Sequence, residues 1–325
     1  MTTTPARRCI LTLAAWLLSG AALAQSYPTK TITIVVPYPP GGGPDLVARV
    51  RADKLAPRLG QAVVVDNKPG AGGLLGASGV AKSAADGHTL LMSPNTLVIA
   101  PHVLPKGAGA GLDVQKDLVP VVAPVTTPMV LVANPSLGVS DLAQLIALAR
   151  KQPGLAYAST GNGSPMHFAG EMFKKSTGVD LLHVPYRGTG PALTAVLGGE
   201  VKLLYVGLGG AAAQIKAGKL VPLAVTEKSR AQMFPQLATA GEQGVKGVEV
   251  NAWFGLFAPA GTPAGVITRL NREVNEVLKL SDVREKLTQA GLELLGGSAQ
   301  LLAGFMQEDD LRYGNIAREL GLKAD

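Results

Sequence analysis

The stretch TITIVVPYPPGGGPD, residues 31–45, joins a strand-like run to a glycine-rich loop and the start of a helix. The glycines let a ligand approach the main chain, and the first amides of the helix have no partner within it. Such a strand–loop–helix unit suits a carboxylate or phosphate. A tight turn without a ligand is the alternative interpretation. The candidate ligand-binding residues of this stretch are Tyr38, Pro40, Gly41, Gly42, Gly43 and Asp45.

Strand-like runs of the same kind recur along the chain. Most are apolar at consecutive positions, which is typical of parallel strands covered by helices on both faces. Segments with helical spacing separate them, so the repeated order of strand and helix predicts an α/β protein. The predicted strands are Thr31–Pro37, Ala62–Asp66, Thr89–Ser93, Met129–Ala133, Leu155–Ser159, Leu181–Tyr186, Val201–Val206, Leu220–Thr226 and Trp253–Pro259.

The C-terminal part has a different pattern, with helical spacing and no predicted strand after Pro259. Ser281 and Ser298 are candidate helix caps there. We therefore expect these helices to wrap over a sheet already built, with residues 25–125 and 245–325 forming one lobe and residues 126–244 the other. The expected crossovers lie at Pro120, Pro124 and Pro128 on one side and at Gln232–Val248 on the other.

Two later loops have the same potential to bind an anion. VPYRGTGPAL, residues 184–193, again reads as strand, glycine-bearing loop and helix, with Tyr186, Arg187, Gly188, Thr189 and Gly190 as candidates. In YASTGNGSPMHF, residues 157–168, the candidates Thr160, Asn162 and Ser164 offer uncharged donors, although Ser164 before Pro165 also fits a helix cap.

Three further residues complete the set of candidates. Ser93 and Asn95 follow a strand of the first lobe and are expected at the edge of the same crevice. His167 lies one turn into a predicted helix, and a packing or capping role competes with ligand contact because no partner completes a catalytic relay.

The N-terminus resembles a Sec-type secretory signal, residues 1–24, with cleavage after Ala24. An uncleaved anchor is the alternative. The only cysteine, Cys9, lies within this signal, so the mature chain would have no disulfide and no cysteine ligand for a metal. Loss of Arg7 and Arg8 lowers the formal charge from +7 to +5, and the remaining basic residues are scattered, unlike those of a nucleic-acid surface. The search for hydrolase and metalloprotease motifs finds none.

Taken together, the motifs closely resemble those of the Bug family of periplasmic solute receptors, which serve tripartite tricarboxylate transporters. The resemblance runs from Tyr27 to the C-terminal helices. It rests on ITIVVPYPPGGGPDLVAR, VVVDNKPGAGG, DGHTLL, YASTGNGSPMHFAGE, HVPYRGTGPALTAVLGGEV, IKAGKL, LAVT and WFGLFAPAGTP in the family's order.

The resemblance implies a two-lobe periplasmic binding protein of type II-like topology. Each lobe would be a mainly parallel sheet flanked by helices, and the ligand would lie in the interlobe cleft. It also implies a monomer without cofactor or enzymatic activity, in which the loops at 39–45 and 186–190 hold a small organic carboxylate through amides, hydroxyls and ordered waters. The receptor would deliver this ligand to membrane transporter subunits. A receptor that signals to a membrane sensor kinase is the alternative, and a periplasmic hydrolase ranks last.

The chain departs from the family pattern at one place. After Tyr205, where the family commonly has Asp and a small polar residue, it has Val206, Gly207, Leu208, Gly209 and Gly210. If this segment lines the crevice, we expect a ligand whose distal group is less polar or bulkier than that of a simple C4 dicarboxylate.

Overall fold

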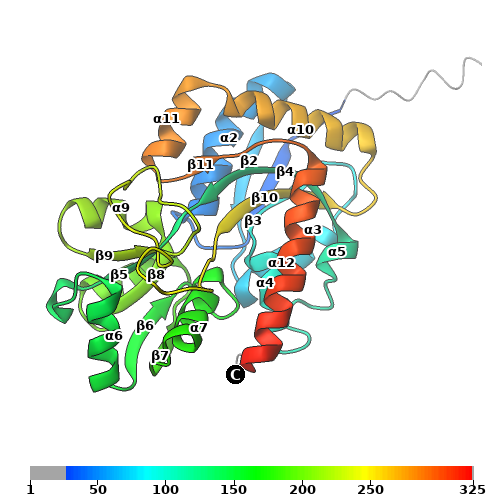
Figure 1. Cartoon of the computed structure of the whole chain (residues 1–325). Helices are drawn as coiled ribbons and strands as arrows, with labels where there is room; N and C mark the ends of the chain where they lie inside the picture. The colour runs from blue at the N-terminus through cyan, green and yellow to red at the C-terminus, as the bar shows by residue number, and fades with distance from the viewer. Residues whose placement is uncertain (1–26, 324–325) are drawn as a thin grey trace, which may run out of the picture.

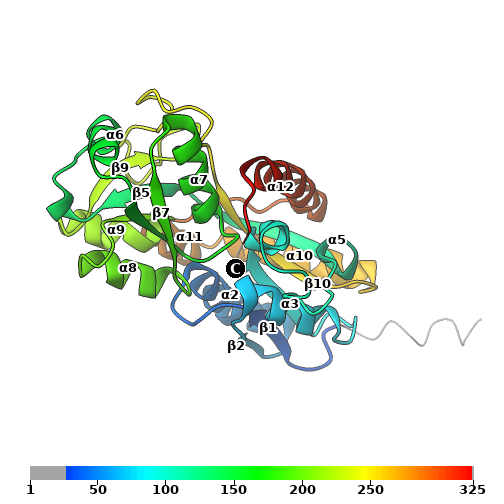
Figure 2. The same cartoon turned by 90° about the horizontal axis from the view of Figure 1, so that it is seen from below.

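The computed structural model describes residues 27–323, so the predicted signal and its cleavage site lie outside the described residues. Two sheets form two lobes, which lie side by side in Figure 1 and are seen from below in Figure 2. Over the described residues, no helix has the length and apolar character needed to cross a bilayer.

The first lobe is built on a six-stranded sheet with the order β11-β4-β10-β3-β1-β2. In chain order its strands are β1 (Ile32–Val36), β2 (Val63–Asn67), β3 (Thr89–Pro94), β4 (Leu118–Thr127), β10 (Ala252–Pro259) and β11 (Glu293–Leu294). The strands β2 and β3 pair in parallel with β1, whereas the pairs β3–β10, β10–β4 and β4–β11 are antiparallel.

The helical elements of this lobe are α2 (Gly43–Leu59), η1 (Ala71–Gly73), α3 (Leu74–Ala81), α4 (Thr96–Ile99), η2 (Ala100–His102), α5 (Val114–Asp117), α10 (Ala264–Leu278), α11 (Ser281–Gln289) and α12 (Ala299–Leu320). Successive residues of β1 face opposite sides of the sheet. Ile34 and Val36 pack in the cluster with α2, α10 and α11, and Val35 packs in the cluster with α3, α4 and α12. Helices therefore cover both faces.

The second lobe is built on a five-stranded sheet with the order β7-β6-β8-β5-β9. Its elements are β5 (Met129–Ala133), η3 (Pro135–Leu137), α6 (Leu142–Lys151), β6 (Leu155–Ser159), α7 (Pro165–Thr177), β7 (Leu181–Pro185), α8 (Thr189–Leu197), β8 (Leu203–Gly207), α9 (Leu208–Lys216) and β9 (Val221–Val225). The strands β7 and β8 pair in parallel with β6, and β5 is antiparallel to both β8 and β9.

Every predicted strand is present, but the expectation of mainly parallel sheets is wrong because both sheets are mixed. Consecutive apolar residues indicate that helices cover both faces of a sheet, which is correct here. They carry no information on strand direction. Two strands were missed. Pro120 and Pro124, expected at a crossover, lie inside β4, and β11 forms after Pro259 where no further strand was expected.

The N-termini of three helices test the predicted capping residues. Ser164 and Ser298 each accept a hydrogen bond from a main-chain amide three residues later, so both predicted caps are confirmed. Ser281 is instead the first residue of α11, whose cap position is Leu280.

The chain passes between the lobes at two adjacent points. Pro128 separates β4 from β5, which confirms this crossover. On the return path, the Val250 amide still donates to the Thr226 carbonyl and Ala252 already pairs with Thr127, so the chain changes lobe near Asn251 and not within Gln232–Val248. The extents proposed from the sequence, residues 25–125 with 245–325 and residues 126–244, differ from these crossover points by a few residues.

Helix α12, the red helix of Figures 1 and 2, ties the lobes together. Its residue Tyr313 meets Phe168 of α7 edge to face, with ring centres 5.0 Å apart, and Glu319 pairs with Lys175. One apolar cluster runs without a break from β1 and α12 into α6 and α7. The relative position of the lobes is therefore set by packing as well as by the two crossovers.

Candidate ligand-binding site between the lobes

The predicted loops lie at corresponding edges of the two sheets. The strands β1, β2 and β3 are parallel and so end at one edge, and β6, β7 and β8 do the same in the second lobe. The two edges meet: a Cβ on Gly163 would lie 2.7 Å from Ala100 Cα, and one on Gly72 would lie 3.9 Å from the Asn162 carbonyl oxygen. The third loop of the second lobe thus meets η1 and η2 of the first lobe at this junction.

The first loop is held by Asp45. Its Oδ2 accepts a hydrogen bond from the Gly41 amide at 2.9 Å, and its Oδ1 accepts one from Asn67 Nδ2 at 3.0 Å. Arg49 Nε also donates to both oxygens. Burial acts to raise the pKa of Asp45, but these donors outweigh it and hold the pKa below its usual value. Asp45 therefore orders the loop, since its carboxylate is already occupied by protein donors.

The same loop leaves a group of amides free at the start of α2. The cap position, Gly42, has no side-chain cap bond. Among residues 27–323, the amides of Gly42, Gly43 and Asp45 have no hydrogen-bond partner, whereas that of Gly41 is used by Asp45. Three unpartnered N–H groups at a helix N-terminus form an anion-binding geometry. Pro40 is exposed beside them.

The second loop repeats this arrangement at the start of α8. Gly188 has a φ of 104°, a conformation that favours glycine, and its amide donates to the carbonyls of Tyr186 and Thr160. Within the described part of the chain, the amides of Arg187, Thr189 and Gly190 donate to no protein group. The Arg187 side chain is exposed and Tyr186 is half-buried. The free donors of this loop are therefore at 187, 189 and 190, not at Gly188.

The third loop follows β6. Some of its polar groups bond within the protein, and others are free to bind a ligand. Ser164 Oγ accepts from the His167 amide at 3.2 Å and donates to the Gly161 carbonyl at 2.7 Å, so it closes the loop. Thr160 Oγ1 donates to the Met166 sulfur at 3.3 Å. The Asn162 side chain is half-buried, and in the described structure it has no hydrogen-bond partner. Asn162 is therefore the donor that remains, and the Thr160 oxygen can still accept.

His167 holds the main chain of this loop in place. Its Nδ1 accepts from the Gly163 amide at 3.4 Å, and its ring stacks on His183 with centres 4.1 Å apart. Burial lowers the pKa of His167 to about 4 and that of His183 to about 3. Both rings are therefore neutral at pH 7, and His167 positions the loop without contributing a charge.

Ser93, in β3, and Asn95, just after this strand, are fully buried. Asn95 Nδ2 donates to Asp309 Oδ2 at 2.9 Å, and Trp253 Nε1 donates to the same oxygen at 2.9 Å. Sequence reasoning missed Asp309 and Trp253 because they lie more than 150 residues away in the chain. A buried asparagine needs such partners, but nothing in the sequence indicates which residues supply them.

Tyr38 contacts both the end of β3 and the loop that contains Gly72. Its hydroxyl donates to the Gly72 carbonyl at 2.9 Å. Burial raises the pKa of Tyr38 to about 12, although hydrogen bonds with Thr96 and Ser93 act in the opposite direction. The Asn67 side chain donates to the Tyr38 carbonyl and to Asp45, so one amide joins the two anchors of the first loop.

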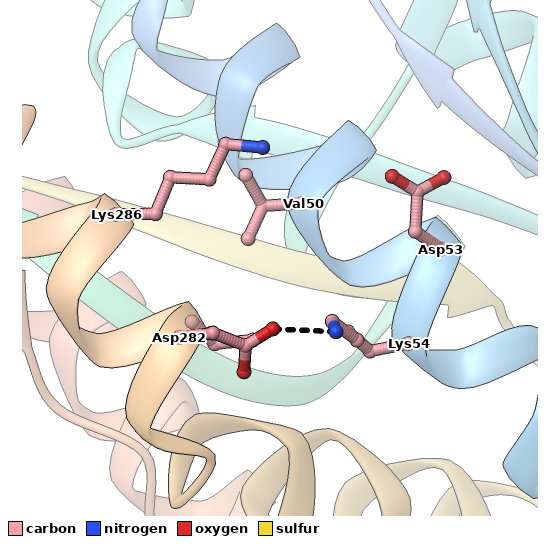
Figure 3. A pocket seen from close by; sticks show the side chains of 6 residues that line it. Val50, Asp53, Lys54, Asp282 and Lys286 are labelled. Carbon is pink, nitrogen blue, oxygen red and sulfur yellow. Dashed lines mark ion pairs between the residues drawn. The ribbon is translucent and has the colours of Figure 1, made fainter.

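Two cavities lie apart from these loops. One of about 250 Å³ is lined by Val50, Asp53, Lys54, Asp282, Val283 and Lys286, and the Lys54–Asp282 ion pair spans it (Figure 3). The other, of about 440 Å³, lies near the Pro128 crossover between Leu208 and the segment Gly291–Leu295. Neither contains a predicted ligand residue. In the described residues, no group of three His, Cys, Asp or Glu side chains is arranged to hold a metal ion.

The segment that departs from the family pattern lies mostly inside the second lobe. Val206 and Leu208 are buried, and a Cβ on Gly207 would lie 3.0 Å from Thr127 Oγ1 at the crossover. A Cβ on Gly210 would lie 2.8 Å from the Thr189 methyl carbon. Only Gly210 therefore borders the second loop, and the expected effect on the ligand stays a prediction.

Comparisons with known proteins agree with this architecture. Residues 47–322 match the model of the tripartite tricarboxylate transporter family receptor. The chain is 37% identical over 309 residues to the protein BugT of Bordetella pertussis, covering 94% of each chain. It is also 37% identical over 324 residues to a UPF0065 protein of Pseudomonas sp. (strain P51), covering 98% of this chain and 96% of the relative.

Solved structures show the same similarity. An R. palustris protein solved with adipate is 34% identical with a TM-score of 0.86, covering 92% of this chain and 100% of that one. MatC from Rhodopseudomonas palustris, with bound malate, is 32% identical with a TM-score of 0.83, covering 89% and 99%. The periplasmic binding protein BugD is 31% identical with a TM-score of 0.84, covering 92% and 100%. This chain therefore belongs to the tripartite tricarboxylate transporter receptor family, that of the Bug proteins.

Proposed function

We propose that this chain is a periplasmic receptor that captures a small organic carboxylate in a cleft between its lobes and delivers it to a tripartite tricarboxylate-type transporter. One observation carries the proposal: two helix N-termini, that of α2 in the first lobe and that of α8 in the second, each carry unpartnered main-chain amides. The ligands of the related structures, adipate and malate, are carboxylates, which supports this ligand class.

The charge distribution around the loops fits a carboxylate held by dipoles. Asp45 is neutralised by Arg49, so it does not present a free negative charge to an incoming anion. His167 is neutral, and Arg187 is the charged side chain of the second loop. We assign the direct contacts to the amides of Gly42, Gly43, Asp45, Arg187, Thr189 and Gly190, with the side chains of Thr160, Asn162 and Thr189 beside them. Gly41, Gly188, Ser164, His167, Tyr38, Ser93 and Asn95 position the loops.

Gly42 provides a direct test because its φ of −80° and ψ of 172° suit any residue. A Cβ there would meet only Pro44 Cδ at 3.8 Å and the Pro39 carbonyl at 3.9 Å, both ordinary contacts. The variant Gly42→Leu should therefore fold normally while its side chain covers the free amides. The matched control is Gly79→Leu on an exposed face of α3, where a Cβ would have no other atom within 4 Å.

The assay is thermal unfolding against a carboxylate library, after unfolding and refolding to remove carried-over ligand. A ligand at 100 times its Kd stabilises the folded state by about 2.7 kcal/mol, which for a mature chain of about 300 residues corresponds to a rise of roughly 4 °C in Tm. We expect this rise for the wild type and for Gly79→Leu, and none for Gly42→Leu. A Gly42→Leu protein that binds as tightly as the wild type would rule out the first loop as the site.

A further inference from the structure

The lobes touch at a second place, away from the third loop. Gly209 is the second residue of α9 in the second lobe, and Ala290 and Gly291 connect α11 to β11 in the first. A methyl group on Gly209 would overlap the carbonyl oxygen of Ala290, and one on Gly291 would overlap the main chain of Gly209. Only residues without a side chain permit this approach.

The surface that Gly209 meets is anchored. The amides of Ala290, Gly291 and Leu292 donate to the carbonyls of Lys286, Thr288 and Leu287, which fixes the end of α11. The Ala290 carbonyl therefore cannot turn away without breaking this cap. Gly209 itself is helical and has no positive φ, so alanine at this position brings steric overlap without backbone strain.

The contact between Gly163 and Ala100 is similarly close, but Gly163 has a φ of 72°, so alanine there also brings backbone strain. A Cβ on Gly163 would lie 2.7 Å from Ala100 Cα, and Ala100 is fully buried with its carbonyl accepting from the amides of Val103 and Leu104. In both contacts a glycine of the second lobe rests directly on fixed main chain of the first. Gly163 is part of the third ligand loop, and Gly209 lies at the start of α9, the helix that follows β8.

We propose that Gly209 and Gly163 are the stops that set how far the lobes close, and so position the two amide-bearing loops around one ligand. This inference rests on the proposed function. Neither side of the Gly209 contact belongs to the proposed ligand contacts, although the neighbouring Gly210 borders Thr189 of the second loop, so the distance measurement is the primary readout for Gly209. A side chain at either glycine holds the lobes apart by about the width of a methyl group, which removes the short hydrogen bonds that one lobe gives to the ligand.

The experiment measures lobe separation and binding in the same variants. Because Cys9 is the only cysteine in the sequence, the mature chain accepts two spin labels, at Lys30→Cys in the first lobe and Lys151→Cys in the second, both exposed. Electron–electron distance measurements and stopped-flow binding are made on wild type, Gly209→Ala, Gly163→Ala and Gly79→Ala. The last variant adds the same methyl group to an exposed helix face with no atom within 4 Å.

We expect Gly209→Ala to shift the distance distribution relative to wild type, with and without ligand. We also expect at least a tenfold loss of affinity, mainly as faster dissociation, because the closed state is destabilised. Gly163→Ala should shift the distance distribution in the same way, and Gly79→Ala should match the wild type in both measurements. If Gly209→Ala does not fold, the lobe separation of Gly163→Ala decides the question, and an unchanged distance distribution in that variant would overturn the inference.

A folded Gly209→Ala protein with wild-type lobe separation and wild-type affinity would overturn the inference. A wild type that binds no carboxylate would instead overturn the proposed function. In that case the distance distributions measured without ligand still test the stops, so the two failures are distinguishable.

Discussion

Replacing Asp45 with asparagine tests whether the first loop depends on a single buried carboxylate. Asp45 is 4% exposed, and its two oxygens accept from the Gly41 amide, Asn67 and Arg49. Asparagine keeps one acceptor oxygen and turns the other into a donor. In either orientation of the amide, at least one of these donors then faces another donor and loses its partner.

The size of the effect follows from the burial of these donors. A buried donor without a partner costs about 1–3 kcal/mol, and the hydrogen bonds to the charged carboxylate are also weakened. Since Arg49 is half-exposed, its share is small. We expect Asp45→Asn to lose about 2–3 kcal/mol of unfolding free energy, and ligand affinity to fall because the loop at residues 39–45 is no longer ordered.

The pH dependence identifies the carboxylate as the cause. Because the pKa of Asp45 is lower in the folded than in the unfolded chain, its stabilising contribution is complete above the unfolded value of about 3.9 and is lost as the pH falls through the folded value. Urea unfolding at pH 7 should therefore show the full difference between wild type and Asp45→Asn, and unfolding near pH 3 a smaller one.

The matched control is Asp53→Asn on the exposed face of the same helix, α2, which should change stability by less than about 0.5 kcal/mol. Equal stability and equal affinity of Asp45→Asn and wild type at pH 7 would refute the assigned role.

Two further predictions concern the histidine stack and the ligand. Because burial lowers the pKa of His167 from 6.5 to about 4, the unfolded chain binds this proton more tightly, and stability should fall as the pH decreases from about 6.5 toward 4. His167→Gln keeps an acceptor for the Gly163 amide, and it should lose less unfolding free energy between pH 7 and pH 5 than the wild type in urea titrations. An equal loss in both proteins would show that His167 does not titrate in this way. In calorimetric titration of a carboxylate panel, compounds with a bulkier or less polar distal group should bind more tightly than malate or succinate, and a panel led by either of these two would contradict the prediction made from residues 206–210.

Local sequence signals predicted the individual elements of this fold well. The bounds of β5 and β6 agree with the predicted runs to the residue, because short apolar runs between turn residues mark buried strands clearly. The caps at Ser164 and Ser298 were equally readable, since a hydroxyl residue before a helical pattern satisfies the first amides. Strand direction was not readable, since burial on both faces gives the same pattern in parallel and mixed sheets.

The missed strands have a physical explanation. Pro120 and Pro124 suggested a crossover, yet β4 carries both prolines within ten residues. Proline is compatible with a strand where its missing N–H is not needed by a neighbour, and β4 has register irregularities opposite β10. The two-residue strand β11 is too short to leave a pattern in the sequence.

In the candidate site, too, local features could be predicted from the sequence and long-range contacts could not. Glycine loops before helices were visible as potential anion sites, because that property is local. Which amides are free was not visible, since it depends on long-range partners. The Gly188 amide bonds to Thr160, and Asn95 bonds to Asp309 from the far end of the chain.

The most direct measurement is a crystal structure of the refolded protein with its tightest-binding ligand. The account predicts one carboxylate with oxygen atoms about 3 Å from amide nitrogens of both residues 42–45 and residues 187–190. A neutral or cationic ligand in this place, or an anion held by side chains of one lobe alone, would contradict it.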